Sequence, residues 1–180
     1  IPVIDTDELA RQVVAPGQPA WRALRDWLGP DYFLPDGTLD RAAVARRVFA
    51  DPPDRARLEA LTHPAIFAEV DRRIAALRAS APPPCLIVVA VPLLYEVGAA
   101  ERFDAVAVVW ATPEQQRDRL MHARGTPPAD ADARLAAQWP LRDKLARADY
   151  VIDNAGTPAS TRAQVRALVA RLCGDSAPAR

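Results

Sequence analysis

The 180-residue chain is long enough for one domain with a single sizeable core, and 50% of its residues are apolar. Its 23 basic and 23 acidic residues balance, so the net charge indicates neither a nucleic-acid-binding surface nor attraction to a membrane. The longest apolar run is too short to span a bilayer, and the first residues do not have the pattern of a signal peptide. We therefore expect a globular cytoplasmic protein that binds neither nucleic acid nor membrane.

The first part of the chain predicts one strand followed by several helices. Residues 1–4 have the composition of the end of a strand, and residues 5–8 follow with the Asp-x-x-Glu pattern of a helix start. A helix beginning at Pro19 carries apolar residues at helical spacing and is stopped by Gly29-Pro30. Another helix is predicted from Asp40 to about Phe49. This stretch is rich enough in helices to form a subdomain.

The middle of the chain predicts two more helices and then two buried strands. One helix is expected to end near Leu61 and the next to run from Pro64 to about Arg78, because proline interrupts a helix. Residues 85–91 are apolar and mostly β-branched, which predicts a strand buried on both faces. Residues 105–110 repeat that composition.

The last third continues the alternation of strands and helices. Thr112 and Gln115 form a capping box, with Pro113 at the first helical position. A short strand at Tyr150 to Ile152 precedes a final helix from Pro158 to about Leu172. Apolar strands that alternate with helices indicate an α/β fold with a parallel sheet covered on both faces.

Polar residues follow three of the predicted strands, where ligands bind in parallel α/β sheets. They are Asp5-Thr6-Asp7, residues 92–96 and Asp153-Asn154. Asp5 and Asp7 lie at a helix start, where two carboxylates can hold a magnesium-bound water or accept a proton from an alcohol. The alternative is that these residues are plain helix caps, which is the interpretation that spacing alone favours.

Several cations lie between the third predicted strand and the last one, and they form either a phosphate clamp or a solvated surface. These cations are Arg117, Arg119, Arg124, Arg134, Arg142 and Lys144. His63 precedes Pro64 at the predicted helix break, where a structural role and a substrate contact are both open. No residue pattern indicates a metal cluster.

An ordered set of motifs resembles the dephospho-CoA kinase family from residue 1 to about Leu172. The motifs are Val3-Ile4-Asp5-Thr6-Asp7-Glu8-Leu9-Ala10-Arg11, Phe49-Ala50-Asp51-Pro52, His63-Pro64, Val91-Pro92-Leu93-Leu94-Tyr95-Glu96 and Ala148-Asp149-Tyr150-Val151-Ile152-Asp153-Asn154. No single motif is decisive, but five in this order are specific. The resemblance implies ATP-dependent phosphorylation of the ribose 3′-hydroxyl of dephospho-CoA, the last step of coenzyme A biosynthesis.

The resemblance also implies a fold and a division of labour. The fold is a P-loop NTPase-type parallel sheet, similar to that of nucleoside-monophosphate kinases, in one domain over residues 1–174. A helical acceptor insertion is expected over about 16–80 and a lid over about 113–140, with a disordered tail at 175–180. The small-molecule partners are dephospho-CoA and ATP, with Mg²⁺ as the metal.

Site residues follow from the resemblance position by position. It implies that Asp7 is the base near the 3′-hydroxyl and that three residues line or support the acceptor side: Asp5, Arg11 and His63. Three arginines fall in or beside the lid, Arg119, Arg124 and Arg134. Asn154 borders the adenine of ATP.

One expected motif is absent from the sequence. The phosphate-binding pattern G-x-x-x-x-G-K-[ST] does not occur, and Lys144, the single lysine, follows an aspartate. We therefore expect a kinase sequence that lacks its first strand and P-loop, so that it can be inactive as it stands, and we assign no metal ligand within it. The alternatives are a non-catalytic homologue that binds CoA or a nucleotide, and a different P-loop kinase for small metabolites.

Overall fold

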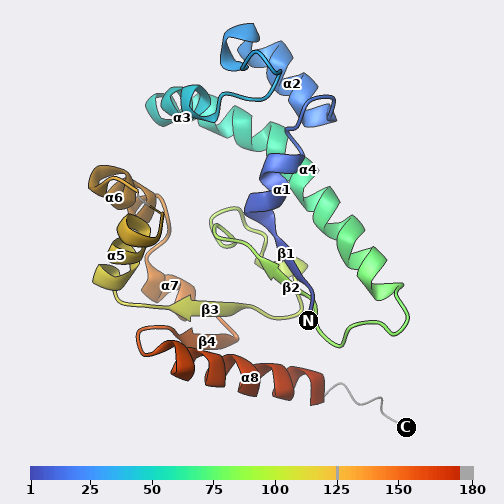
Figure 1. Ribbon diagram of the computed structural model, residues 1–180, viewed down its shortest axis with the longest axis vertical. Helices are drawn as coiled ribbons and strands as arrows, with labels where there is room; N and C mark the ends of the chain where they lie inside the picture. Colours follow the sequence, from blue (N-terminus) through green and yellow to red (C-terminus); the bar gives the residue numbers. More distant parts are fainter. Residues whose placement is uncertain (125, 175–180) are drawn as a thin grey trace. The chain divides into compact units, whose positions relative to one another are not determined.

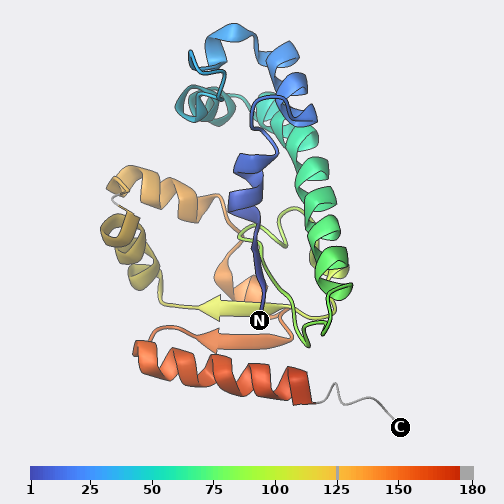
Figure 2. The same cartoon turned by 45° about the vertical axis from the view of Figure 1, so that its right-hand side comes forward.

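The computed structural model describes residues 1–124 and 126–174, without the side chains of Ala50, Ala123, Arg124 and Arg134. The chain divides into two compact units, one from Ile1 to Val91 and one from Pro92 onward. Figure 1 labels their helices and strands, and Figure 2 shows them from a second direction. No helix of the described residues is long and apolar enough to cross a membrane.

The first unit combines a two-stranded parallel sheet with a group of helices. Its elements are β1 (Val3–Asp5), α1 (Thr6–Gln12), α2 (Pro19–Leu28), the 3₁₀ turn η1 (Pro30–Tyr32), α3 (Arg41–Ala50), α4 (Pro52–Arg78) and β2 (Val88–Ala90). In the sheet, Val3 pairs with Val88 and Asp5 with Ala90. The C-terminal ends of both strands therefore lie at the same edge, where α1 begins.

Two apolar clusters hold the first unit together. One forms among α2, α3 and α4 around the buried residues Leu24, Leu28 and Val44. The other joins β1, α1 and α4 through Ile4, Leu9 and Val70. Burying one such side chain contributes about 1.5–3 kcal/mol. α4 contributes residues to both clusters and therefore connects them.

The prediction of two helices separated at His63-Pro64 is wrong, because α4 is one helix of 27 residues that continues through Pro64. Leu61 and Ala65 pack in the first cluster, and Ile66 packs in the second. Apolar residues on both sides of the proline are thus held by tertiary packing. Such packing can offset the cost of about 3 kcal/mol that proline imposes inside a helix.

The second unit also contains a two-stranded parallel sheet. Its elements are η2 (Ala100–Arg102), β3 (Ala107–Trp110), α5 (Pro113–Arg124), α6 (Pro128–Ala136), α7 (Leu141–Leu145), β4 (Tyr150–Asp153) and α8 (Pro158–Gly174). Ala107 pairs with Tyr150 and Trp110 with Asp153. α5 and α6 pack together, and α8 runs along β4 (Figures 1 and 2).

The predicted α/β class with parallel strands is confirmed, but the predicted burial of both strand faces is wrong. Val108 in β3 is buried, whereas its neighbour Val109 is 57% exposed. In β2, Val88 is 39% exposed. The side chains of a strand alternate between two faces, and a continuously apolar sequence does not by itself determine whether both faces are covered.

Candidate functional site

The junction of β1 and α1 brings the first predicted site residues to the carboxyl edge of the sheet. Asp5 Oδ1 accepts hydrogen bonds from the backbone N–H groups of Asp7, at 2.8 Å, and of Glu8, at 3.4 Å. Asp5 is therefore the N-cap of α1. Asp7 is the second residue of the same helix and is exposed, and no described hydrogen bond or ion pair involves its carboxylate, so it is available to a ligand.

Thr6, which the sequence did not single out as a separate site residue, fixes this junction. It is buried, and its Oγ1 donates a hydrogen bond of 2.8 Å to the carbonyl oxygen of Ala90 at the end of β2. The bond ties the first residue of α1 to the neighbouring strand. The position of Asp7 is thereby coupled to the sheet. A signal was present in the sequence, since a threonine between two aspartates directly follows a strand.

α1 is held against α4 by apolar and polar contacts. Leu9 and Val70 are almost completely buried in the shared cluster. On the surface, Arg73 of α4 donates hydrogen bonds to Gln12 of α1 and, at 2.8 Å, to Glu69. These contacts fix the orientation of α1, and with it the position of Asp7, relative to α4.

The remaining acceptor-side residues lie on the same two helices. Arg11 is exposed on α1, one turn after Asp7. His63 is half-buried on α4, two turns before Val70 and hence on a similar face. Among the described contacts, no hydrogen bond or ion pair joins Asp7, Arg11 and His63 directly. The structure therefore gathers them on one pair of helices without linking their side chains.

The loop after β4 is held by hydrogen bonds from α5 and α8. The Asn154 N–H donates to the Trp110 carbonyl oxygen at 2.7 Å, which extends the β3–β4 ladder. Thr161 of α8 donates to Asn154 Oδ1 at 3.0 Å, and Gln115 of α5 donates to the Ala155 carbonyl oxygen at 2.8 Å. Thr112 and Gln115 also cap α5 reciprocally, so the predicted capping box is confirmed.

Arg119 belongs to the same loop environment. Its Nη2 donates a 2.7 Å hydrogen bond to the Asn154 carbonyl oxygen, so two residues that the sequence analysis assigned to the nucleotide side meet in the second unit. Arg117 instead pairs with Asp132 across α5 and α6, at 2.6 Å. The side chains of Arg124 and Arg134 lie outside the described residues.

A buried ion pair in the second unit was missed by the sequence analysis. Lys144 is 7% exposed, and its Nζ lies 2.7 Å from Glu96 Oε1. The same oxygen accepts the N–H of Trp139 at 2.7 Å, while Glu96 Oε2 and Tyr95 OH are buried without a partner. Lys144 is thus neither a surface cation nor part of a phosphate clamp in this structure. Its being the single lysine among arginines was a possible signal.

The protonation of Glu96 follows from this environment. Burial raises the pKa of the carboxyl group, but the hydrogen bonds from Lys144 and from the Trp139 N–H outweigh burial and leave the pKa below its ordinary value. Glu96 is therefore ionised near neutral pH. The pair connects the segment after β2 to α7, which carries Lys144.

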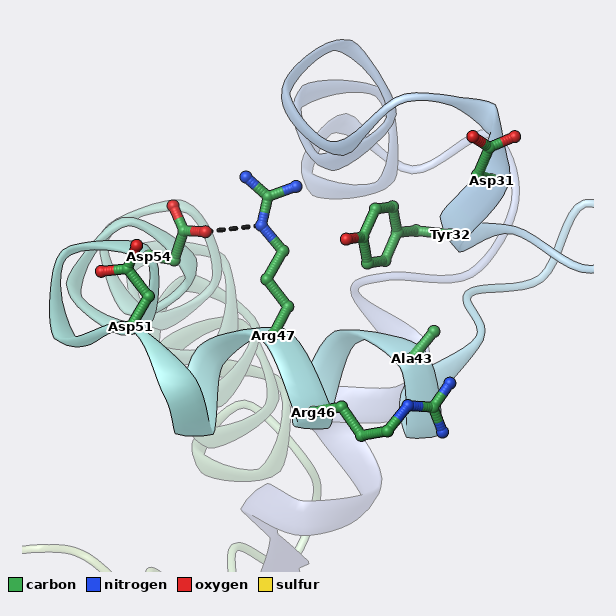
Figure 3. Close-up of a pocket in the computed structure, with 7 residues that line it drawn as sticks. All are labelled: Asp31, Tyr32, Ala43, Arg46, Arg47, Asp51 and Asp54. Atoms are coloured by element: carbon green, nitrogen blue, oxygen red, sulfur yellow. Dashed lines mark hydrogen bonds and ion pairs between the residues drawn. The ribbon is translucent and has the colours of Figure 1, made fainter.

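A shallow pocket of about 650 Å³ lies in the helical part of the first unit, between η1, α3 and the start of α4 (Figure 3). Its lining residues are Asp31, Tyr32, Ala43, Arg46, Arg47, Asp51 and Asp54. Arg47 points between Asp54 and the Tyr32 ring and is ion-paired with Asp54. Three carboxylates face two arginines there, so the pocket has no excess of positive charge for an anion.

Comparison with protein families identifies relatives over most of the chain. A family model described as dephospho-CoA kinase matches residues 1–159. A dephospho-CoA kinase from Anaeromyxobacter dehalogenans is 49% identical over 173 residues, covering 96% of this chain and 81% of that protein. One from Geobacter metallireducens is 47% identical, with 92% of this chain and 82% of that protein covered.

Solved structures resemble the fold as well. The crystal structure of TT1252 from Thermus thermophilus has a TM-score of 0.79 and 32% sequence identity, covering 95% of this chain and 84% of that one. The dephospho-CoA kinase from Campylobacter jejuni has a TM-score of 0.68 at 24% identity, covering 97% of this chain and 87% of that one. The latter likeness supports the fold alone.

Proposed function

The chain belongs to the dephospho-CoA kinase family, and on that premise we propose which of its residues carry out the reaction. The family has a P-loop kinase fold and transfers a phosphoryl group from ATP to the ribose 3′-hydroxyl of dephospho-CoA, the last step of coenzyme A synthesis. Phosphoryl transfer depends mainly on positioning and on stabilising charge around a loose transition state. The residues proposed below are therefore assigned roles in orientation and proton transfer.

Asp7 orients the 3′-hydroxyl of the acceptor and takes its proton late in the transfer. The observation that carries this assignment is the difference between the two carboxylates at the β1–α1 junction: Asp5 is engaged in capping, whereas the Asp7 carboxylate is exposed. Thr6 and Leu9 hold α1 in place on either side of Asp7. A base needs to be within hydrogen-bond reach of the proton it accepts, and a fixed helix provides that reach.

The helical stretch over about 16–80 forms the acceptor side, to which Arg11 and His63 contribute, and Asp5 supports it by fixing α1. The segment over about 113–140 forms the lid, which is consistent with the packing of α5 against α6. Arg119, Arg124 and Arg134 act in or beside this lid, and Asn154 borders the adenine of ATP. The hydrogen bond between Arg119 and Asn154 supports a common location for that pair.

Mg²⁺ accompanies ATP in this proposal. Among the described residues, no group of three His, Cys, Asp or Glu side chains is arranged to hold a metal ion. Magnesium in kinases is bound largely by substrate phosphates and water, with one or two carboxylates. The described residues do not form a complete protein site for it, and we assign no step to a protein-bound metal.

The role of Asp7 is tested by replacing Asp7 with Asn in the full-length protein and measuring ATP-dependent conversion of dephospho-CoA. We expect kcat to fall at least about a hundredfold, because the amide cannot accept the proton. Asp26→Asn is the matched control, since it makes the same change at an exposed carboxylate of α2. An Asp7→Asn variant with nearly unchanged kcat would show that another group orients the hydroxyl.

A further inference from the structure

Arg11 and Arg41 lie at the helix that carries Asp7, and neither belongs to the arginines of the first unit that are paired with a carboxylate. Arg47 pairs with Asp54, Arg55 with Glu59, and both Arg72 and Arg73 with Glu69. In the part of the chain that the structure describes, neither Arg11 nor Arg41 forms an ion pair. Two uncompensated guanidinium groups therefore remain near the helix that carries Asp7.

The two side chains are close to one another at the C-terminal end of α1. Arg41 comes from the first position of α3, and its Nη2 reaches back to the carbonyl oxygen of Ala10 at 3.4 Å. Ala10 directly precedes Arg11. The contact thus joins residues 31 positions apart and brings a second guanidinium group to the last turn of α1.

Burial lowers the pKa of the Arg41 guanidinium, and the positive charge of Arg11 lowers it further. The carbonyl end of a helix carries about half a negative charge, which explains the attraction of one cation but does not neutralise two. Like charges held together repel, and an anion between them removes that repulsion. The two positive charges at the C-terminal end of α1 therefore favour a ligand with more than one negative charge.

We propose that Arg11 and Arg41 form the subsite for the 5′-diphosphate of dephospho-CoA. The inference rests on the proposed role of Asp7 and extends it along α1. Asp7 and Arg11 are four residues apart, so they share one helix face and are separated by about 6 Å along the helix axis.

The chemistry of the acceptor matches that spacing. Its 3′-hydroxyl and 5′-diphosphate are carried by C3′ and C5′ of one ribose, which are separated only by C4′. One face of α1 can therefore meet both groups. Planar guanidinium groups bind phosphate oxygens through paired, charge-assisted hydrogen bonds. The pair would select acceptors that carry a 5′-diphosphate over a plain nucleoside.

Two other places compete for the same ligand group. The pocket of Figure 3 contains Arg46 and Arg47, but Arg47 is already neutralised by Asp54. The phosphates of ATP are the other source of a diphosphate. The test must therefore distinguish binding of the acceptor from binding of ATP, and the contribution of Arg41 from that of Arg46.

The experiment measures acceptor binding by calorimetry to the full-length protein, with the donor site saturated by a non-hydrolysable ATP analogue. The variants are Arg11→Ala, Arg41→Ala and Arg41→Lys. We expect each alanine variant to weaken dephospho-CoA binding about ten- to a hundredfold, the range for a lost charge-assisted hydrogen bond. Adenosine binding should stay within about twofold, and Arg41→Lys should recover part of the loss because it retains the charge.

Controls remove other arginines of the same unit. Arg22→Ala removes an exposed cation of α2 with no described side-chain contact, and Arg46→Ala removes one from the pocket. Both should bind dephospho-CoA like the unmodified protein. Unchanged dephospho-CoA binding in Arg11→Ala and Arg41→Ala would overturn the proposal. So would an equal loss of adenosine binding, a loss confined to the ATP analogue, or a loss in Arg46→Ala as large as in Arg41→Ala.

The subsite and the catalytic assignment fail in different measurements. Asp7→Asn is expected to change kcat, whereas the arginine variants change the dissociation constant of the acceptor and its KM. Normal turnover in Asp7→Asn together with selective loss of dephospho-CoA binding in Arg41→Ala would refute the role of Asp7 and retain the diphosphate subsite. Circular dichroism of each variant excludes unfolding as the cause, and Arg11→Ala keeps the test decisive if Arg41→Ala does not fold.

Discussion

Asp5 and Asp7, two aspartates separated by one residue, have different roles at the start of α1. Asp5 accepts backbone N–H groups and thereby satisfies donors that the first turn of a helix leaves free. Asp7 has no such duty and stays exposed. Thr6 between them points the other way, into the sheet. A single short segment therefore separates structural support from the chemistry proposed for Asp7.

The capping role of Asp5 makes a prediction about stability. Asp5→Ala removes the acceptor for the N–H groups of Asp7 and Glu8, and we expect the free energy of unfolding to fall by about 1 kcal/mol. Urea denaturation followed by circular dichroism measures the change. Asp26→Ala on α2 is the control and should differ from the unmodified protein by less than about 0.5 kcal/mol. Equal stability of Asp5→Ala and Asp26→Ala would argue that the cap contributes nothing.

At the scale of elements, short segments are fixed by single well-placed contacts. α7 has only five residues, too few to be stable alone, and its Lys144 is held by Glu96. α4 presents the opposite case, since its length and its two apolar clusters maintain the helix across Pro64. The local signal of Pro64 is thus overridden in α4, whereas the helical composition around Leu141 does produce α7.

The ion pair of Lys144 and Glu96 should be costly to break on one side only. Lys144→Met leaves a buried carboxylate without its cation, and we expect destabilisation of about 3–5 kcal/mol. The double variant Lys144→Met with Glu96→Leu should recover much of that loss, because no charge remains buried. Thermal and urea unfolding of the two variants give the comparison. A single variant no less stable than the double variant would show that solvent already compensates Glu96.

Over the whole molecule, charge is balanced and distributed into local networks. The 23 cations comprise 22 arginines and Lys144, and most described arginine pairs lie on helix surfaces. Glu69 is the clearest example, because hydrogen bonds from Arg72 and Arg73 lower its pKa to about 2. This network lies on α4 next to the α1 contact and so supports the acceptor side.

The acid stability of the protein should reflect Glu69. Its pKa in the folded state is lowered, so the stabilisation is complete above the unfolded value of about 4.5 and is lost as pH falls toward 2. Glu69→Gln should therefore reduce stability at pH 7 by up to about 1 kcal/mol, the upper range for exposed pairs. Near pH 2 the two proteins should converge. Urea titrations across this pH range measure the difference, and a gap that persists at pH 2 would assign the effect to packing.

The sequence by itself determined the features that depend on a few neighbouring residues. The N-cap at Asp5, the capping box of Thr112 and Gln115, and the α/β alternation all follow from local hydrogen bonding and side-chain shape. The family was likewise readable from ordered motifs, and the comparisons confirmed it.

Tertiary structure decided whatever depends on residues far apart in the chain. The continuation of α4 through Pro64, the exposed face of β3, the burial of Lys144 against Glu96 and the approach of Arg41 to Arg11 could not be read locally. Each of these features is decided by packing or electrostatic contacts with distant residues. Those contacts compete with local conformational preferences of a few kcal/mol. Lys144 and Glu96 are 48 positions apart, and Arg41 is 31 positions from the Ala10 carbonyl oxygen that it contacts. A local sequence pattern does not contain partners at such separations.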